Sequence, residues 1–228
     1  MKEGFNMKLL EMCKKEYLKY NIDNRILCYI DNYRIENDQY VVSCLDENKE
    51  YLITLRLNVK DVNPKVICLS GKAQSGKNEF ANYINDTKCL KIAYGDYVKF
   101  IASQYYGWNG KKDEIGRSIL NNTGDKMRNY DKNIIKNQLF TIVNIVKFDY
   151  DYILITDARF KDEIDVFKEL YNTISIRIER NQTNNLTEEQ KNHKTETSLD
   201  DYKFDYYLYN DSTENYKKEV IKLWNKIC

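Results

Sequence analysis

Two glycines and a lysine, Gly71, Gly76 and Lys77, have the residue types and spacing that bind an anion. They lie in the segment VICLSGKAQSGKNEF, where four residues separate the glycines and the lysine follows directly. Glycines permit a tight turn whose backbone N–H groups point at one phosphate, and the lysine can reach the outer phosphates of a nucleotide. The spacing therefore predicts a loop that binds a nucleoside triphosphate. The residues predicted to contact it are Gly71, Lys72, Ala73, Gln74, Ser75, Gly76, Lys77 and Asn78.

The residues around this loop predict the strand and the helix that such a loop needs. Residues 66–69 form an unbroken apolar run, typical of a strand buried on both faces of a parallel sheet. A helix is expected at 78–84, and its positive N-terminal end would face the phosphates. The alternative is a plain glycine-containing turn. The Ser or Thr that usually follows the lysine and binds magnesium is replaced by Asn78, so the residue that completes the metal shell is left open.

Composition limits the class of protein. Lys and Arg number 36 against 35 Asp and Glu, so the formal net charge of +1 provides no overall field for nucleic acid. The six cysteines form no CxxC pair and there is one histidine, which argues for reduced thiols and against zinc. No apolar run approaches the roughly 18 residues of a membrane span. We expect a cytoplasmic protein, in the host cytoplasm if the gene is viral.

Residues 1–62 differ from the rest and are expected to form an accessory module. A helical pattern covers residues 7–20, and strand-like runs follow at 26–35, 39–45 and 50–57, separated by turn residues. This predicts a helix and an antiparallel three-stranded meander. The order resembles a double-stranded RNA-binding domain, but the closing helix and a basic patch are missing. A packing or dimerisation module is the preferred interpretation, with the boundary at Asn63 and Pro64.

Residues 63–228 alternate between strand and helix signals, which predicts an α/β fold with a parallel sheet flanked by helices. A long helical region at 112–147 is expected to break near Thr123–Gly124 and again near residues 129–131. The polar stretch 179–201 is too long for an ordinary connection, and such loops are usually functional. Strands are expected at 66–69, 89–93, 152–156, 173–178 and 204–209, and helices at 78–84, 97–106, 160–171 and 213–227.

Five segments of this second part together resemble one family. They are GKAQSGKN, YGDYVKFIA, GWNGKKDEIGRSILNNTGDKMR, ITDARF and HKTETSLDDYKFDYYLYND, in this order over roughly residues 65–215. In this region the chain resembles the phage-type deoxynucleoside monophosphate kinases, within the larger group of P-loop nucleoside and metabolite kinases. The resemblance implies the P-loop kinase fold, ATP and Mg²⁺ as cofactors, a small-molecule nucleotide as substrate, and it favours a homodimer. The first 62 residues lie outside it.

The resemblance gives roles to two arginines and to an acidic and basic pair. Arg117 and Arg128 match arginines that bind the acceptor monophosphate, and without the family they would be read as solvated helix residues. An arginine fork binds phosphate oxygens two at a time. Arg128 is also expected in catalysis with Lys77, because positive charge must offset the repulsion between two nucleotides. Asp96 and Lys99 lie just past a strand and are expected either to contact the acceptor or to pair with each other.

Asp157 and Arg159 follow the apolar strand 152–156, which is expected to neighbour the loop strand. Asp157 is predicted to hold a hydrated magnesium ion, and Arg159 to face the transferred phosphate. Both are assigned to catalysis. The alternative for Asp157 is a helix N-cap.

The long polar stretch carries the remaining candidates. Arg180, and with it Arg177, is expected to act as a lid arginine that closes on ATP. His193 and Glu196 match an element of the family and are interpreted as lid or site-ordering residues, and they are assigned to substrate binding. A solvated histidine is the alternative.

The preferred hypothesis is ATP-dependent phosphorylation of a deoxynucleoside monophosphate to its diphosphate. One alternative is a related kinase for another small phosphorylated acceptor, such as a phosphomevalonate-like substrate. The other is a non-catalytic nucleotide-binding regulator or RNA-binding protein that uses the N-terminal meander. The sequence leaves the base, the sugar and the oligomeric state open.

Overall fold

The computed structural model of this chain describes residues 7–20, 25–180, 192–211 and 214–228, which form a three-stranded and a five-stranded sheet. The larger sheet has the order β5-β6-β4-β7-β8, with every neighbouring pair parallel. The predicted α/β class, with a parallel sheet flanked by helices and an N-terminal meander, is therefore confirmed. The strands are β4 (Lys65–Ser70), β5 (Cys89–Ile92), β6 (Tyr152–Ile155), β7 (Thr173–Glu179) and β8 (Tyr206–Tyr209).

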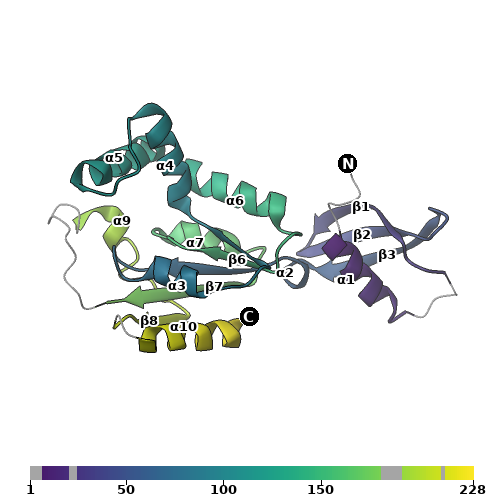
Figure 1. Cartoon of the computed structure of the whole chain (residues 1–228). Helices are drawn as coiled ribbons and strands as arrows, with labels where there is room; N and C mark the ends of the chain where they lie inside the picture. Colours follow the sequence, from purple (N-terminus) through teal and green to yellow (C-terminus); the bar gives the residue numbers. More distant parts are fainter. Residues whose placement is uncertain (1–6, 21–24, 181–191, 212–213) are drawn as a thin grey trace.

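The central strand β4 supplies both faces of the sheet with core residues, because successive side chains of a strand point to opposite sides. Val66 and Cys68 pack with residues of α4 (Tyr94–Tyr105), α6 (Ile134–Val146) and α7 (Lys161–Lys168). Ile67 and Leu69 pack with α3 (Lys77–Tyr83) and α10 (Glu214–Ile227) on the opposite face. All four side chains are fully buried, as the unbroken apolar run predicts. Figure 1 shows the sheet between these two groups of helices.

The N-terminal part has the predicted helix and meander. Helix α1 (Met7–Tyr17) packs on an antiparallel sheet of β1 (Tyr29–Glu36), β2 (Gln39–Leu45) and β3 (Tyr51–Asn58). At the β1–β2 turn Asn37 and Asp38 both have positive φ, as a tight hairpin turn requires. In Figure 1 this part lies at the end of the molecule opposite to α5 (Glu114–Tyr130) and α9 (Lys194–Thr197).

A four-residue helix, α2 (Val59–Val62), joins the two parts and was not predicted. The Tyr40 hydroxyl donates to Oδ1 of Asn63 at 2.7 Å, and Nδ2 of Asn63 donates to the carbonyl of Leu170 at 2.8 Å. Phe148, which follows α6, belongs to the core of the meander. The division between residues 62 and 63 stays a prediction, and the two parts share packing at this junction.

Several helices differ from the sequence-based expectation. Helix α1 ends at Tyr17 and α7 ends at Lys168, each three residues earlier than expected. Helix α5 continues through Thr123 and Gly124, where a break was predicted. Thr123 and Gly124 are both buried, and the Thr123 hydroxyl donates to the Ile119 carbonyl one turn earlier in the helix. The predicted break at 129–131 is confirmed by the end of α5 at Tyr130. Helix α4 begins at Tyr94, three residues earlier than expected. Within the described ranges, no helix is long and apolar enough to cross a membrane.

Candidate active site

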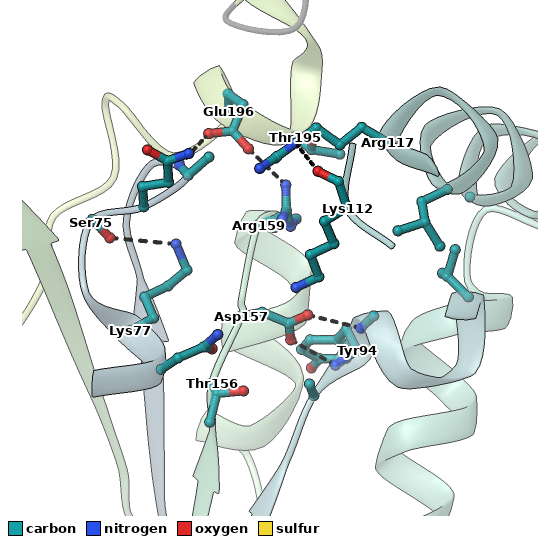
Figure 2. A pocket seen from close by; sticks show the side chains of 18 of the residues that line it. Ser75, Lys77, Tyr94, Lys112, Arg117, Thr156, Asp157, Arg159, Thr195 and Glu196 are labelled. Carbon is teal, nitrogen blue, oxygen red and sulfur yellow. Dashed lines mark hydrogen bonds and ion pairs between the residues drawn. The ribbon is translucent and has the colours of Figure 1, made fainter. Parts of the chain in front are cut away.

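A cavity of about 600 Å³ lies where the chain leaves β4, β5 and β6. Its walls come from the loop and helix after β4, the start of α4, one face of α5, the end of β6 and helix α9. Figure 2 shows side chains from all of these segments pointing into the same space. In open α/β sheets ligands bind at this edge, beyond the carboxyl ends of the strands. The cavity is therefore the candidate active site.

The loop of residues 71–76 depends on its two glycines. Both have positive φ, +153° at Gly71 and +109° at Gly76. A Cβ at Gly71 would lie 2.4 Å from the Ile178 carbonyl oxygen, and one at Gly76 would lie 2.2 Å from Nδ2 of Asn210. Asn210 also donates to the carbonyl of Ser75 at 3.0 Å. The loop is therefore held against β7 and the residue after β8 at positions that no side chain fits.

Lys77, the first residue of α3, is folded back over the loop. Its Nζ donates to the carbonyls of Gly71, at 2.5 Å, and Lys72, at 2.8 Å. Burial, together with the nearby Arg159, lowers the pKa of Lys77 to about 8. The ammonium thus stands at the mouth of the loop in a desolvated position, where a bound anion would be strongly attracted.

Asp157 lies on the cavity floor and accepts two backbone hydrogen bonds from the start of α4. Oδ1 accepts from Tyr94 N at 2.7 Å and Oδ2 from Gly95 N at 2.9 Å, as the dashed lines in Figure 2 show. A Cβ on Gly95 would lie 2.8 Å from Oδ2. The carboxylate therefore accepts from two N–H groups that the N-terminus of a helix leaves without a partner. The helix is α4, which follows β5, whereas Asp157 itself follows β6.

The donor set suits a hydrated magnesium ion. Mg²⁺ prefers oxygen ligands, keeps several waters and commonly binds through one or two carboxylates plus the phosphates of its substrate. Asp157 keeps lone pairs beyond the two that accept N–H groups, and Thr156, Asn78 and Glu79 also line the cavity. No group of three or more His, Cys, Asp or Glu side chains with metal-binding geometry occurs in the part of the chain that the structure describes. Asp157 therefore fits a metal held mainly by water and nucleotide.

One face of α5 forms the wall opposite the loop. Arg117, Leu120, Asn121, Gly124 and Arg128 all line the cavity, and their spacing places them along a single helical stripe. The stripe has a guanidinium near each end and apolar or amide groups between them. Such a wall can bind a molecule that carries an anionic group and a planar, partly polar group.

Arg128 is held by a buried carboxylate. Its Nη2 lies 3.8 Å from Oε1 of Glu163, and its guanidinium lies 4.6 Å from the centre of the Phe160 ring. Oε2 of Glu163 accepts from the backbone N–H groups of Arg159 and Phe160, at 2.8 and 3.2 Å. Burial raises the pKa of Glu163 to about 7. Gly124 leaves the room that Arg128 needs, since a Cβ there would lie 3.1 Å from its Nη1.

Helix α9 closes the cavity from above. Oε1 of Glu196 accepts from Nη1 of Arg159 at 2.9 Å, and Oε2 accepts from the backbone N–H of Ala73 at 2.7 Å. His193 Nε2 lies 3.2 Å from Oδ2 of Asp125, a residue of α5. The α9 carboxylate therefore bridges the loop of residues 71–76 and the arginine after β6 (Figure 2).

Comparison with known proteins adds little to this geometry. The sequence matches no protein-family model and no curated protein. One similar solved structure is the dephospho-CoA kinase from Campylobacter jejuni, which is 14% identical, with 71% of this chain and 96% of that chain covered and a TM-score of 0.47. We conclude nothing about the substrate of this chain from so distant a likeness.

Most of the predicted site residues line the same cavity. These are Ala73, Gln74, Ser75, Gly76, Lys77, Asn78, Lys99, Arg117, Arg128, Asp157, Arg159, Arg180, His193 and Glu196. Arg180 lies on the loop side, where its Nη1 donates to the Gln74 carbonyl at 3.2 Å.

Four residues lie elsewhere. Gly71 and Lys72 belong to the loop but are not among the lining residues. Asp96 is also outside the lining and pairs with Lys99 at 2.7 Å, as the alternative interpretation expects. Arg177 is buried beside Ser70 and Asp200, so its guanidinium is part of the core and does not face the cavity.

The lining residues that were not predicted include Lys112, Asn121 and Glu163. Lys112 and Asn121 lie in one of the segments that resemble the family. Their closeness to Arg117 in the sequence is the signal that could have identified them as site residues. Glu163 is the third residue of α7, where a glutamate usually indicates a capping box. Its contact with Arg128 joins residues from two different helices, and no sequence spacing reveals it.

Proposed function

We propose that this protein transfers a phosphoryl group from ATP to a deoxynucleoside monophosphate. The observation that carries the proposal is the pairing of two walls across one cavity. The loop of residues 71–76 with Lys77 forms one wall, and the α5 stripe with Arg117 and Arg128 forms the other. Such a cavity can bring two phosphate-bearing molecules face to face.

The charges of the cavity suit this reaction. ATP and a monophosphate repel each other, and the protein must offset that repulsion while it excludes water. Lys77, Arg128 and Arg159 all line the space between the two walls. Phosphoryl transfer needs mainly positioning and positive charge, and a kinase turnover of about 1 to 100 per second corresponds to a barrier of roughly 15 to 17 kcal/mol.

Each wall has a separate task in the proposal. The loop N–H groups and Lys77 hold the triphosphate, and Arg180, which already contacts Gln74, closes on it. Arg117 and Arg128 hold the acceptor phosphate, with Glu163 orienting Arg128. Magnesium, bound through water near Asp157 and through the phosphates, would neutralise part of the triphosphate charge.

The test is ADP release by the purified protein with ATP, Mg²⁺ and a panel of acceptors. The panel contains deoxynucleoside and ribonucleoside monophosphates and, as a different class, phosphorylated alcohols such as phosphomevalonate. Turnover with a deoxynucleotide supports the proposal. Turnover with phosphorylated alcohols alone assigns the second hypothesis. ATP binding without acceptor-dependent turnover assigns a regulatory nucleotide-binding protein. Lys77→Met serves as the inactive control, because it removes the ammonium at the loop.

A further inference from the structure

Within this proposed function, we infer that Lys112 is a substrate-binding residue whose ammonium contacts the phosphate of the acceptor nucleotide. Lys112 lines the cavity although it lies in the loop before α5 and outside every helix and strand. Figure 2 shows its side chain pointing into the cavity with the amino group toward Asp157. This places a cation over the floor, between the α5 wall and the phosphate-binding loop.

Hydrogen bonds hold the backbone of the segment that carries Lys112. Nε1 of Trp108 donates to the Lys111 carbonyl at 2.8 Å, and Nε of Arg117 donates to the Lys112 carbonyl at 3.0 Å. Asp113 caps α5 by accepting from Gly116 N at 2.8 Å. These contacts fix the backbone on both sides of Lys112 and couple it to an arginine of the α5 wall.

Gly116 shows how closely this segment is packed. A Cβ at Gly116 would lie 2.0 Å from the Lys111 carbonyl oxygen, so no other residue fits beneath the loop. The loop therefore lies directly on the first turn of α5.

Charge supports an anionic ligand at this position. Among the described residues, the Lys112 ammonium has no hydrogen bond and no ion pair, whereas Lys99 is paired with Asp96. Lys112 is exposed as a whole, but partial burial lowers the pKa of its ammonium, the neighbouring cations Lys99, Arg117 and Arg159 lower the pKa further, and Asp157 raises it. Cations gathered around a cavity repel one another, and a bound phosphate dianion removes this repulsion.

The direct test compares two neighbouring lysines. Lys112→Ala removes the cation in the cavity, and Lys111→Ala removes the same charge from the same loop outside the lining. We expect Lys112→Ala to lower kcat/KM for the monophosphate by about 10- to 100-fold, as for the loss of one charge-assisted contact. Lys111→Ala should stay within about twofold of the unmodified protein, and Lys112→Arg should recover part of the loss. Equal kinetics for Lys112→Ala and Lys111→Ala would overturn the inference.

A binding measurement separates this inference from the proposed function. If the unmodified protein phosphorylates no acceptor of the panel, the proposed function fails, and calorimetry with inorganic pyrophosphate decides the role of Lys112. Weaker pyrophosphate binding by Lys112→Ala than by Lys111→Ala would keep Lys112 as an anion-binding residue. Equal affinities, or no binding by the unmodified protein, would refute it. Circular dichroism of both variants checks that the loop change leaves the fold intact.

Discussion

The backbone N–H of Ala73 donates a hydrogen bond to Oε2 of Glu196 at 2.7 Å. Ala73 belongs to the loop whose N–H groups are expected to receive phosphate oxygens, and the other oxygen of Glu196 accepts from Arg159. In this arrangement a carboxylate of α9 occupies two groups that a triphosphate would use. In the proposed function, a bound triphosphate must therefore displace Glu196 or share the Ala73 N–H and the Arg159 guanidinium with it.

Glu196→Ala should bind ATP roughly tenfold more tightly in the absence of acceptor, because it frees Ala73 N–H and Arg159 and removes a negative charge. Calorimetric titration with ATP and Mg²⁺ measures the change. Glu169→Ala, which alters an exposed carboxylate at the end of α7, is the matched control. Weaker ATP binding by Glu196→Ala would mean that the carboxylate orders the loop for ATP.

Gly95→Ala should lower kcat by about tenfold or more and should also lower the melting temperature, because the displaced carboxylate no longer accepts from Tyr94 N and Gly95 N. The new Cβ would stand 2.8 Å from Oδ2 of Asp157 and displace the carboxylate from the cavity floor. Alanine is the better helix former by about 1 kcal/mol, so α4 itself should tolerate the change. Ser103→Ala, at an exposed position of α4, controls for effects on the helix. Unchanged turnover in Gly95→Ala would show that the position of Asp157 does not matter for the reaction.

The arginines should divide between the two substrates. Arg117→Ala and Arg128→Ala should raise KM for the monophosphate and lower kcat/KM by roughly tenfold to a hundredfold, while ATP affinity without acceptor stays the same. Arg180→Ala should mainly weaken ATP use, because Arg180 contacts the loop at Gln74. Steady-state kinetics with each substrate varied in turn measures both effects. If Arg128→Ala impairs ATP binding and spares the acceptor, the two walls are assigned the wrong way round.

ATP binding near pH 8.5 should take up a proton. The pKa of Lys77 is lowered to about 8, so part of the population is neutral at this pH, and the triphosphate raises the pKa again by stabilising the ammonium. Calorimetry in buffers with different ionisation enthalpies measures the uptake. It should disappear below about pH 7, where Lys77 is already charged, and it should be absent in Lys77→Met. Uptake that persists in Lys77→Met would place the titrating group elsewhere.

The same pKa shift predicts the pH dependence of stability without ATP. The lysine pKa falls from 10.5 to about 8 on folding, so between these values the unfolded chain binds the additional proton. The free energy of unfolding should therefore rise with pH in this window more steeply for the unmodified protein than for Lys77→Met. Denaturant titrations between pH 7.5 and about 10 give this comparison. Parallel curves for the two proteins would contradict the assignment to Lys77.

A chain that begins at Asp61 should still bind ATP with a dissociation constant within about twofold of the full chain, because no described residue before Asp61 lines the cavity. It should melt at a lower temperature, since Phe148 would lose its packing partners in the meander and Asn63 would lose its bond to Tyr40. Exposing one large aromatic side chain costs about 1.5 to 3 kcal/mol. Loss of ATP binding by a truncated protein with native circular dichroism would show that the meander supports the site.

Residues close in sequence carried most of the correct predictions. The run from Val66 to Leu69 and the glycines at 71 and 76 are local patterns, and a strand, a tight loop and a helix follow from them at those positions. The alternation of strand and helix signals in residues 63–228 is also a local pattern, and it predicted the parallel sheet. The predicted start of α4 was wrong because a residue far away in the sequence contributes to it. Helix α4 begins at Tyr94 because a carboxylate 63 residues away accepts its first N–H.

The sequence by itself determined the glycine turn at residues 71–76, the α/β alternation and the presence of Arg117 and Arg128 on one helix, because each depends on spacing along one segment. Tertiary structure decided which of these groups meet. It put the Glu196 carboxylate on the loop, buried Arg177 beside Ser70, and placed Glu163 against Arg128. It also placed Lys112 in the lining of the cavity. Such contacts join side chains on different elements, so their geometry depends on how helices and strands pack and not on the order of residues within any one of them.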